Sequence, residues 1–403
     1  MVFKRSNIEK QVSNLPKQVI WCKTCLMSNQ RPRIIFNSKG ICSGCDNAKN
    51  KRKIDWNKRE MELKKLLDKH RSKSGDYDVI VPSSGGKDSA FVAHMLKYKY
   101  NMNPLTVTWS PLEYTEIGKE NFYSLINSGL SNILITPDGI IQRRLSRLCF
   151  EELGDAFHTF VMGQISVPFH MAIKFNIKLV FFGENGELEY AGDPQYIDKP
   201  YKPHKEWLRQ HFKGVSFEKL INFGIKKKKY MRDIKKDLIK KNLWFYKPPS
   251  EKELNQYKIK GKYFFSYYKK WTPQENYYYA VENTGFKANP QRTEGTYSKY
   301  NSLDDKIDGF FYYTRHIKFG VGRAMMDSAQ EVRNNHLTKE EGLALIKRFD
   351  GNYPDRYEKE FLDYISMDKD EFHELCDTFR SEHLWKKTGS SWELRKKPWD
   401  ILE

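Results

Sequence analysis

Residues 77–96 constrain the fold of this 403-residue chain more than any other segment. The apolar run Tyr77–Val81 predicts a buried strand, and Ala90–Leu96 predicts a helix that follows after a short connection. The connection, residues 82–89, reads Pro-Ser-Ser-Gly-Gly-Lys-Asp-Ser. A strand, a glycine turn and a helix in this order are typical of a loop that holds an anion at a helix N-terminus.

Further apolar runs and helical periods extend this pattern along the chain. We expect strands at residues 105–109, 132–136 and 178–182. Helices are expected between them, at residues 116–126 and 156–175. This alternation predicts an α/β fold with a doubly wound, mainly parallel sheet that helices cover on both faces. Beyond residue 271 helical periods dominate, as in Leu337–Phe349 and Glu358–Ile365, and we expect a mostly helical C-terminal part.

Four of the six cysteines form two pairs near the N-terminus, Cys22 with Cys25 and Cys42 with Cys45. The pattern C-x2-C, sixteen residues, C-x2-C lets two tight turns present four thiolates to one tetrahedral metal ion. We predict a zinc ribbon, with Gly40 and Gly44 in its turns and a short strand at residues 31–36. Redox dithiols, unrelated buried thiols or an iron-sulfur cluster are alternatives that the spacing leaves open.

Lysine and arginine outnumber aspartate and glutamate by 70 to 51, which gives a formal net charge of +19. The charge is uneven, because residues 1–75 carry +13, residues 203–270 carry +14 and the remainder carries −8. An excess of this kind favours nucleic acid, an anionic surface or a phosphate-rich substrate as partner.

The basic segment 203–270 combines the run Lys226–Lys229 with many aromatic residues. Such rings can stack on the bases of single-stranded nucleic acid, or they can form the apolar face of helices whose other face is solvated. We favour the solvated or partner-facing interpretation. The rings concerned are Trp244, Phe245, Tyr246, Tyr263, Phe264, Phe265, Tyr267 and Tyr268.

The loop at residues 84–89 is not a Walker motif, because no glycine stands five residues before Gly86. Its two glycines let the backbone approach an anion closely, and the first amides of the following helix point toward that anion. Hydroxyl groups can add donors, and Asp88 is a suitable magnesium ligand. We therefore assign ligand binding to Ser84, Gly85, Gly86, Lys87, Asp88 and Ser89.

The string Ser84–Ser89 resembles the PP-loop of the N-type ATP pyrophosphatases, which include asparagine and NAD synthetases and several tRNA-modifying enzymes. Together with the cysteine pairs, four further segments look like the N-acetyl sugar amidotransferases of bacterial surface-polysaccharide and nonulosonic acid pathways, of the pseudaminic or legionaminic acid type. These segments are Phe182–Tyr190, Gly295–Gly309, Lys318–Arg323 and Lys347–Gly351. The likeness runs from about residue 19 to about residue 385 and is weakest in the basic segment.

This resemblance implies that ATP, Mg²⁺ and Zn²⁺ are the cofactors and that a nucleotide-linked or free N-acetyl sugar is the substrate. The acetamido oxygen would attack the α-phosphate of ATP, with release of pyrophosphate, and ammonia would then displace AMP to leave an acetamidino group. Neither Cys149 nor Cys376 lies in a glutaminase nucleophile motif. The resemblance therefore implies partner subunits, a glutaminase and a cyclase-like protein, that supply ammonia.

Other candidate residues follow predicted strands or carry charge. Trp109 ends the second predicted strand, and Gly183, Glu184, Asn185 and Glu187 follow the fourth, at the sheet edge where ligands of open α/β folds bind. We assign the binding of ATP, magnesium or substrate to Trp109, Gly183, Glu184 and Asn185, and a catalytic role to Glu184 as well. A polar cap of the following helix is the alternative for Glu184, Asn185 and Glu187. Asp88, Lys87, Lys318 and Arg323 complete the predicted catalytic set, the last two as partners of phosphate groups.

Two further groups of polar residues have a structural alternative to a chemical role. Asp304, Asp305 and Asp308 place three carboxylates close together, but a solvated turn explains them equally well. His158 and His170 lie in an apolar helical stretch, and we expect them to be packing residues.

The expected organisation is a zinc ribbon at 1–50, a helical connector at 51–75, a PP-loop ATP-binding domain at 76–202, a basic insertion at 203–270 and a helical C-terminal region at 271–403. The N-terminus has no apolar run of signal-peptide length, and no stretch approaches the roughly 18 apolar residues of a membrane span. We therefore expect a cytoplasmic protein without a transmembrane segment.

Two other functions compete with the sugar amidotransferase. The first is a PP-loop tRNA-modifying enzyme with a zinc ribbon, although no cysteine stands close after the loop to carry sulfur. The second is a non-enzymatic RNA-binding protein, against which the intact Ser84–Ser89 string argues. We expect nucleic acid not to be the partner.

Overall fold

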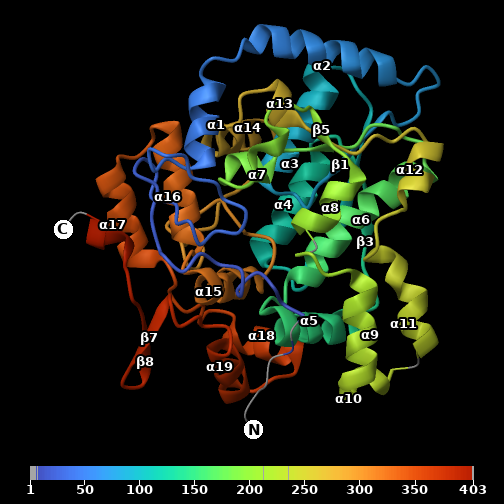
Figure 1. The fold of residues 1–403 in the computed structure, drawn as a ribbon. Coiled ribbons are helices and arrows are strands. Elements are labelled where there is room, and N and C mark those ends of the chain that lie inside the picture. Colours follow the sequence, from blue (N-terminus) through green and yellow to red (C-terminus); the bar gives the residue numbers. More distant parts are fainter. Residues whose placement is uncertain (1–5, 7, 212, 235, 402–403) are drawn as a thin grey trace.

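A parallel sheet lies at the centre of the computed structural model, which describes residue 6 and residues 8–211, 213–234 and 236–401 (Figure 1). Its strands are β1 (Val79–Pro82), β2 (Pro104–Trp109) and β3 (Ser131–Ile135), in the order β1-β2-β3. Val79 pairs with Pro104, and Leu105 pairs with Ser131. A mixed α/β fold with a parallel sheet is therefore confirmed, and the first three predicted strands appear within two residues of their expected bounds.

A second sheet, in the order β4-β6-β5, adjoins the first one through a bridge between Ile80 and Val180. Its strands are short: β4 (Phe181–Phe182), β5 (Tyr201–Lys202) and β6 (Lys262–Phe264). β4 and β6 run parallel, whereas β5 runs antiparallel to β6. The strand predicted at residues 178–182 is thus shorter than expected.

Helices cover both faces of the central sheet. Successive side chains of β1 point to opposite faces, so their contacts show which helices lie on each face. Ile80 joins a core with α5 (Gly139–Leu153) and α6 (His158–Lys174), whereas Val79 and Val81 join a core with α2 (Trp56–His70), α3 (Lys87–His94) and α14 (Pro273–Thr284). α4 (Glu116–Asn127) connects β2 to β3. A π-helical turn, Met95–Lys99, extends α3, and a short helix, α7 (Gly186–Glu189), follows β4.

The basic segment is built into this core. It contains α8 (His204–His211), α9 (Phe217–Lys227), α10 (Lys229–Arg232), α11 (Lys236–Asn242), α12 (Glu251–Gln256), β6 and α13 (Phe265–Tyr268). Of the eight rings considered for base stacking, five are buried: Tyr246, Tyr263, Phe264, Phe265 and Tyr268. These rings are packed inside the protein, so they do not offer a stacking surface to nucleic acid.

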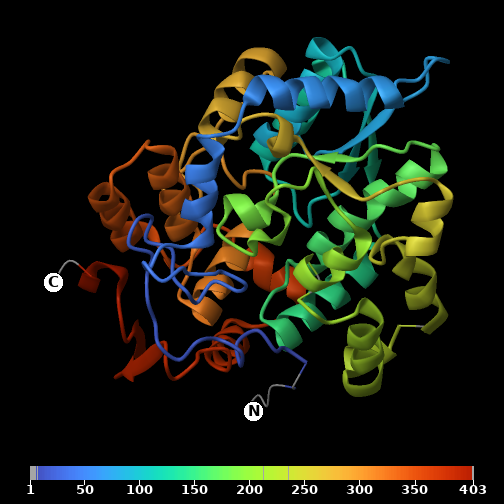
Figure 2. The same cartoon turned by 45° about the horizontal axis from the view of Figure 1, so that its top comes forward.

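The cysteine-containing N-terminal segment shares a third core with the C-terminal part. Leu26 and Met27 are buried with Phe319, Val321 and Leu343, among others, and α1 (Ser43–Lys51) lies beside α16 (Arg323–Asn334) (Figure 2). The predicted strand at residues 31–36 is wrong, because these residues form turns and irregular backbone apart from a bridge between Phe36 and Cys42.

The C-terminal part is mostly helical, as predicted. It contains α15 (Asp308–Phe319), α16, α17 (Lys339–Phe349), α18 (Glu358–Ile365) and α19 (Lys369–Asp377), followed by a hairpin of β7 (Trp385–Thr388) and β8 (Ser391–Leu394). Residues 1–5, 7, 402 and 403 of the predicted terminal modules lie outside the described residues. Within the described part of the chain, no helix has the length and apolar character needed to cross a membrane.

Candidate functional site

The loop between β1 and α3 has the conformation that its glycines predict. Gly85 has φ of +93°, and a Cβ atom there would lie 2.6 Å from the backbone nitrogen of Phe122, so only glycine fits. Gly86 is the N-cap of α3, and the nearest heavy atom to a Cβ there would be Ser84 Oγ at 3.9 Å. The backbone at Gly86 therefore faces open space beside the first turn of a helix, where an anion is favoured.

Hydrogen bonds and an ion pair between side chains hold the loop in its conformation. Ser83 donates from Oγ to Ser89 Oγ over 2.8 Å, and Ser89 donates to the carbonyl of Gly86 over 3.0 Å. Lys87 is buried and forms an ion pair of 2.5 Å with Asp88, whose other carboxylate oxygen accepts a hydrogen bond of 2.9 Å from Asn276. Asp88 is thus held in place from two sides.

The loop and the residues after β4 form two walls of one cavity of about 530 Å³, which we call the loop cavity. Of the predicted residues, Ser84, Gly86, Asp88, Ser89, Trp109, Gly183, Glu184, Asn185, Glu187 and Arg323 line it. Residues from four distant parts of the sequence therefore meet at this place.

A compartment of about 350 Å³ adjoins the loop cavity and shares Ser84, Gly86 and Asp88 with it. It is lined by Gly85 and Lys87, and by Asp304 and Asp308. Asp305 and Asp308 are buried, and Asp305 accepts a hydrogen bond of 2.9 Å from the backbone nitrogen of Ile307. The solvated-turn interpretation of these aspartates is therefore wrong. Burial raises the pKa of Asp308 to about 6.

Glu184 is the carboxyl group of the loop cavity whose pKa is raised. Burial, and then the nearby Asp88 carboxylate, raise its pKa to about 7. Tyr190 donates a hydrogen bond of 3.3 Å to Glu184 Oε1. A buried carboxyl group beside a second carboxylate forms a site that a cation can stabilise.

Three buried donor groups on the cavity wall have no hydrogen-bond partner among the residues that the structure describes. They are Arg31 Nε, Trp109 Nε1 and Asn185 Nδ2. Buried polar groups are nearly always paired in folded proteins, and all three groups are donors. The cavity therefore suits a ligand rich in acceptor oxygen or nitrogen atoms.

Several cationic residues of the loop cavity were not predicted: Arg31, Lys202, Lys262 and Arg315. Lys202 donates a hydrogen bond of 3.0 Å to Asn185 Oδ1, and burial lowers the pKa of Lys262 to about 7. The sequence gives no sign of these four residues, because basic residues are numerous and none of the four belongs to a recognisable motif. Their positions in the site depend on the short strands β5 and β6, on the turns of the cysteine segment and on the helix at residues 308–319.

Arg323 and Lys318 have different surroundings, although both were predicted to contact phosphate. Arg323 begins α16, pairs with Asp327 over 3.0 Å, donates a hydrogen bond to the hydroxyl of Tyr312 and faces the cavity. Lys318 lies outside the loop cavity. Its ammonium donates to the carbonyl of Leu153 over 2.6 Å, at the C-terminus of α5, and lies 3.3 Å from Glu9. A carbonyl at a helix end requires such a donor, so Lys318 is used as a cap.

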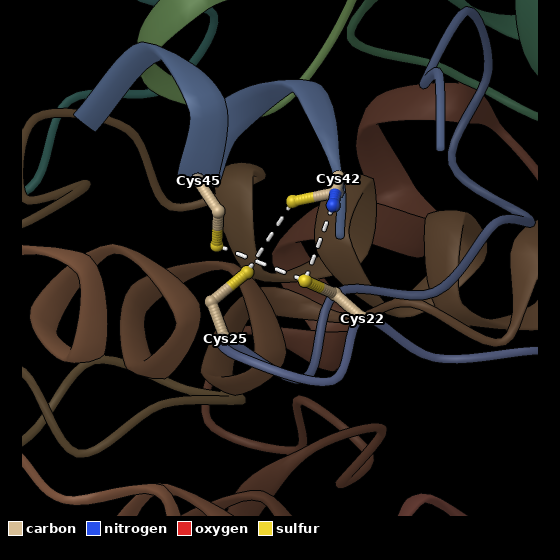
Figure 3. A group of neighbouring side chains, drawn as sticks. All are labelled: Cys22, Cys25, Cys42 and Cys45. Carbon is tan, nitrogen blue, oxygen red and sulfur yellow. Dashed lines mark hydrogen bonds between the residues drawn. The ribbon is translucent and has the colours of Figure 1, made fainter. Parts of the chain in front are cut away.

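The four cysteines of the N-terminal segment converge, as their spacing predicts (Figure 3). All four sulfur atoms lie within 4.8 Å of one another, with 3.7 Å between the sulfurs of Cys22 and Cys45 and 3.5 Å between those of Cys25 and Cys42. All four residues are buried. Four converging buried thiols fit a tetrahedral metal ion such as zinc.

The cysteine segment contacts the residues in and just after α7 directly. Ser43 donates a hydrogen bond of 2.7 Å to the carbonyl of Gly192, Lys51 pairs with Glu189 over 2.9 Å, and Arg33 pairs with Glu187 over 2.6 Å. These contacts hold the segment around α7, which also carries Glu184 and Asn185.

Comparison with known proteins adds a family relation for the C-terminal part. Over 87 residues the chain is 32% identical to the uncharacterized protein MJ1599 of Methanocaldococcus jannaschii, an alignment that covers 21% of this chain and only 31% of that relative. Residues 294–398 match the family described as LPS biosynthesis protein WbpG-like, C-terminal domain. The matched segment contains Tyr312, Arg323 and Asp327 of the loop cavity. This match supports a place for the chain among proteins of lipopolysaccharide and related surface-glycan biosynthesis.

Proposed function

We propose that this protein is an ATP-dependent amidotransferase that converts an acetamido group of an N-acetyl sugar into an acetamidino group during surface-glycan biosynthesis. One observation carries the proposal. The segment that matches the WbpG-like domain supplies Arg323 and Tyr312 to the same cavity into which Gly86 and Asp88 of the glycine loop open.

The loop cavity has the donors that a polyphosphate requires. In this proposal the amides at Gly86 and Lys87 bind the β- and γ-phosphates of ATP at the N-terminus of α3. Lys202 and Arg323 add positive charge around the cavity. The unpartnered indole nitrogen of Trp109 is available to an acceptor of the nucleotide or of the sugar.

Asp88 and Glu184 would hold Mg²⁺. Both carboxylates line the loop cavity, and the raised pKa of Glu184 reflects burial and a negative neighbour, which a divalent cation would relieve. When bound, the metal ion supplies positive charge beside the phosphate oxygens.

The proposed reaction has two steps. First, the acetamido oxygen attacks the α-phosphorus of ATP, an O–P bond forms, and pyrophosphate leaves. Ammonia then adds to the activated carbon, the bond between that carbon and the AMP oxygen breaks, and the added nitrogen loses a proton to give an amidinium group. Donors around Gly86 would stabilise the charge on the departing pyrophosphate.

Ammonia would come from separate subunits, a glutaminase with a cyclase-like partner. Within this chain Cys149 and Cys376, the two cysteines outside the metal centre, are both buried. Burial raises the pKa of each thiol above its ordinary value, the opposite of what a nucleophilic cysteine requires. The tRNA-modifying alternative has less support, because most of the rings that were candidates for base stacking are buried.

The test is to incubate the purified protein with ATP, Mg²⁺, ammonium chloride and either UDP-N-acetylglucosamine or CMP-N-acetylneuraminate. We expect sugar-dependent release of AMP and pyrophosphate, and a product whose mass corresponds to replacement of one oxygen by NH. Release of ADP and phosphate, or a product mass that shows added sulfur, would contradict the proposal.

A further inference from the structure

A separate cavity of about 260 Å³ lies beside the loop cavity, and we call it the side cavity. Four residues line both cavities: Arg31, Val161, Phe311 and Arg315. The two spaces therefore adjoin at a junction formed by two arginines, a valine and a phenylalanine.

The side cavity also extends toward the surface. Arg33 and Lys213 line it, and their side chains keep 25% and 18% of their accessible area. Gln11, also on its lining, is half-buried. Among the described residues that line the side cavity, none belongs to the glycine loop.

His158 is a buried polar residue of the side cavity whose side chain makes no hydrogen bond within the described part of the chain. It is 1% exposed. Burial, and then the charge of Lys213, lower its pKa to about 3, so the ring is neutral at physiological pH. A neutral imidazole offers one donor and one acceptor to a small polar molecule.

The charges along the side cavity are mostly paired inside the protein. Lys213 pairs with Asp155, Lys318 with Glu9 over 3.3 Å, and Arg33 with Glu187 over 2.6 Å. Arg31 and Arg315 at the junction have no acidic partner within ion-pair distance among the residues described. The junction therefore carries net positive charge, which opposes the passage of a cation.

We propose that the side cavity is the route by which ammonia enters the loop cavity. This inference rests on the proposed function, in which ATP and the sugar occupy the loop cavity while a small nucleophile must still arrive. The arginine junction repels ammonium and admits neutral NH3. His158 accepts a hydrogen bond from ammonia, or donates one to it, on the way.

The test uses two variants of the full chain, His158→Phe, which removes both ring nitrogens, and Gln11→Trp, which narrows the rim. His170→Phe is the matched control, because His170 lies on the same helix but bonds the carbonyl of Lys247 over 2.8 Å instead of facing the side cavity. Two quantities are measured with the nucleotide sugar that supports turnover: the KM for ammonium chloride, and the sugar-dependent exchange of pyrophosphate into ATP without ammonium.

We expect the KM for ammonium to rise about tenfold in His158→Phe, the effect of losing one buried hydrogen bond. The KM for ammonium should also rise in Gln11→Trp. In both variants the rate of pyrophosphate exchange should equal that of the wild type. The control His170→Phe should match the wild type in both measurements. An unchanged KM for ammonium in both variants would overturn the route. A higher KM for the sugar instead would also overturn it and assign the side cavity to an anionic part of the sugar substrate. Absence of sugar-dependent exchange in the wild type would overturn the proposed function, and the ammonia route with it.

Discussion

Arg333 donates a hydrogen bond from Nη1 to the sulfur of Cys25 over 3.3 Å, and its Nη2 donates to the carbonyl of Glu189 over 2.8 Å. One buried guanidinium thus connects the cysteine cluster to the last residue of α7, the helix that follows Glu184 and Asn185. A donor beside a metal-bound thiolate offsets its negative charge, so Arg333 should influence both metal affinity and the position of α7.

We predict that Arg333→Met weakens zinc binding by about 10-fold to 100-fold, because the thiolates lose their cationic neighbour. Competition with a chromophoric chelator measures the affinity, and elemental analysis of the wild type should find about one zinc ion per chain. Arg348→Met is the control, because Arg348 is exposed on α17. Equal zinc affinity in both variants would show that Arg333 has no effect on the metal centre.

The two loop glycines should respond differently to alanine. Gly85→Ala must adopt φ of +93° and place a methyl group against the backbone of Phe122, so we expect it to lower the free energy of unfolding by about 1 to 3 kcal/mol or more. Gly86→Ala should change stability by less than about 1 kcal/mol, because its methyl group meets no atom within 3.8 Å. That methyl group instead occupies the place proposed for phosphate, and turnover should be lost. Denaturant unfolding combined with AMP release separates the two effects, and a Gly86→Ala variant with wild-type turnover would contradict the proposed phosphate site.

Asp88→Asn should abolish AMP release and leave the fold intact. The amide keeps the shape of the side chain but removes the negative charge that the proposed magnesium ion requires. The exposed Asp68, on α2, provides the control Asp68→Asn, which should behave as wild type. Near-UV circular dichroism checks the fold, and full turnover in Asp88→Asn would remove this residue from the proposed mechanism.

The raised pKa of Glu184 predicts a specific dependence of stability on pH. Because the folded state holds this proton more tightly than the unfolded state, the stabilisation is present below about pH 4.5 and is lost as the pH rises to about 7. The free energy of unfolding of the wild type, relative to Glu184→Gln, should therefore fall by about 2 to 3 kcal/mol over this interval.

Glu187→Gln is the control for this measurement. Although burial opposes it, hydrogen bonds from Arg33 hold the pKa of Glu187 at about 2, so its ionisation does not change between pH 5 and 8. The difference in stability between wild type and Glu187→Gln should stay constant over that range. A constant difference for Glu184→Gln as well would show that the Glu184 carboxyl is not perturbed.

The sequence predicts the parts of the molecule that depend on local pattern. The strand, loop and helix around Gly85 and the convergence of the four cysteines follow from short-range periodicity and ligand spacing. The two-residue strand β5 is too short for periodicity to reveal, so the position of Lys202 could not be predicted. Asp308 is polar and stands next to a glycine, which is typical of a solvated turn. Its burial depends on tertiary packing, which the local sequence does not reveal. Lys318 is close to Arg323 in the sequence, but its ammonium group caps the C-terminus of α5 and does not face the loop cavity.

Because the N-terminal segment shares its core with the C-terminal part, it cannot complete its folding until that part has been translated. The hydrogen bond between Arg333 and Cys25 spans 308 residues of chain, so the cysteines leave the ribosome long before their neighbours in α16 exist. At about 5 to 20 residues per second, the interval is roughly 15 to 60 seconds. During that time the exposed thiols and apolar residues of the first segment have no folded partner. Zinc captured early would protect them, and the cell's supply of zinc would then determine how much of the nascent protein reaches the folded state.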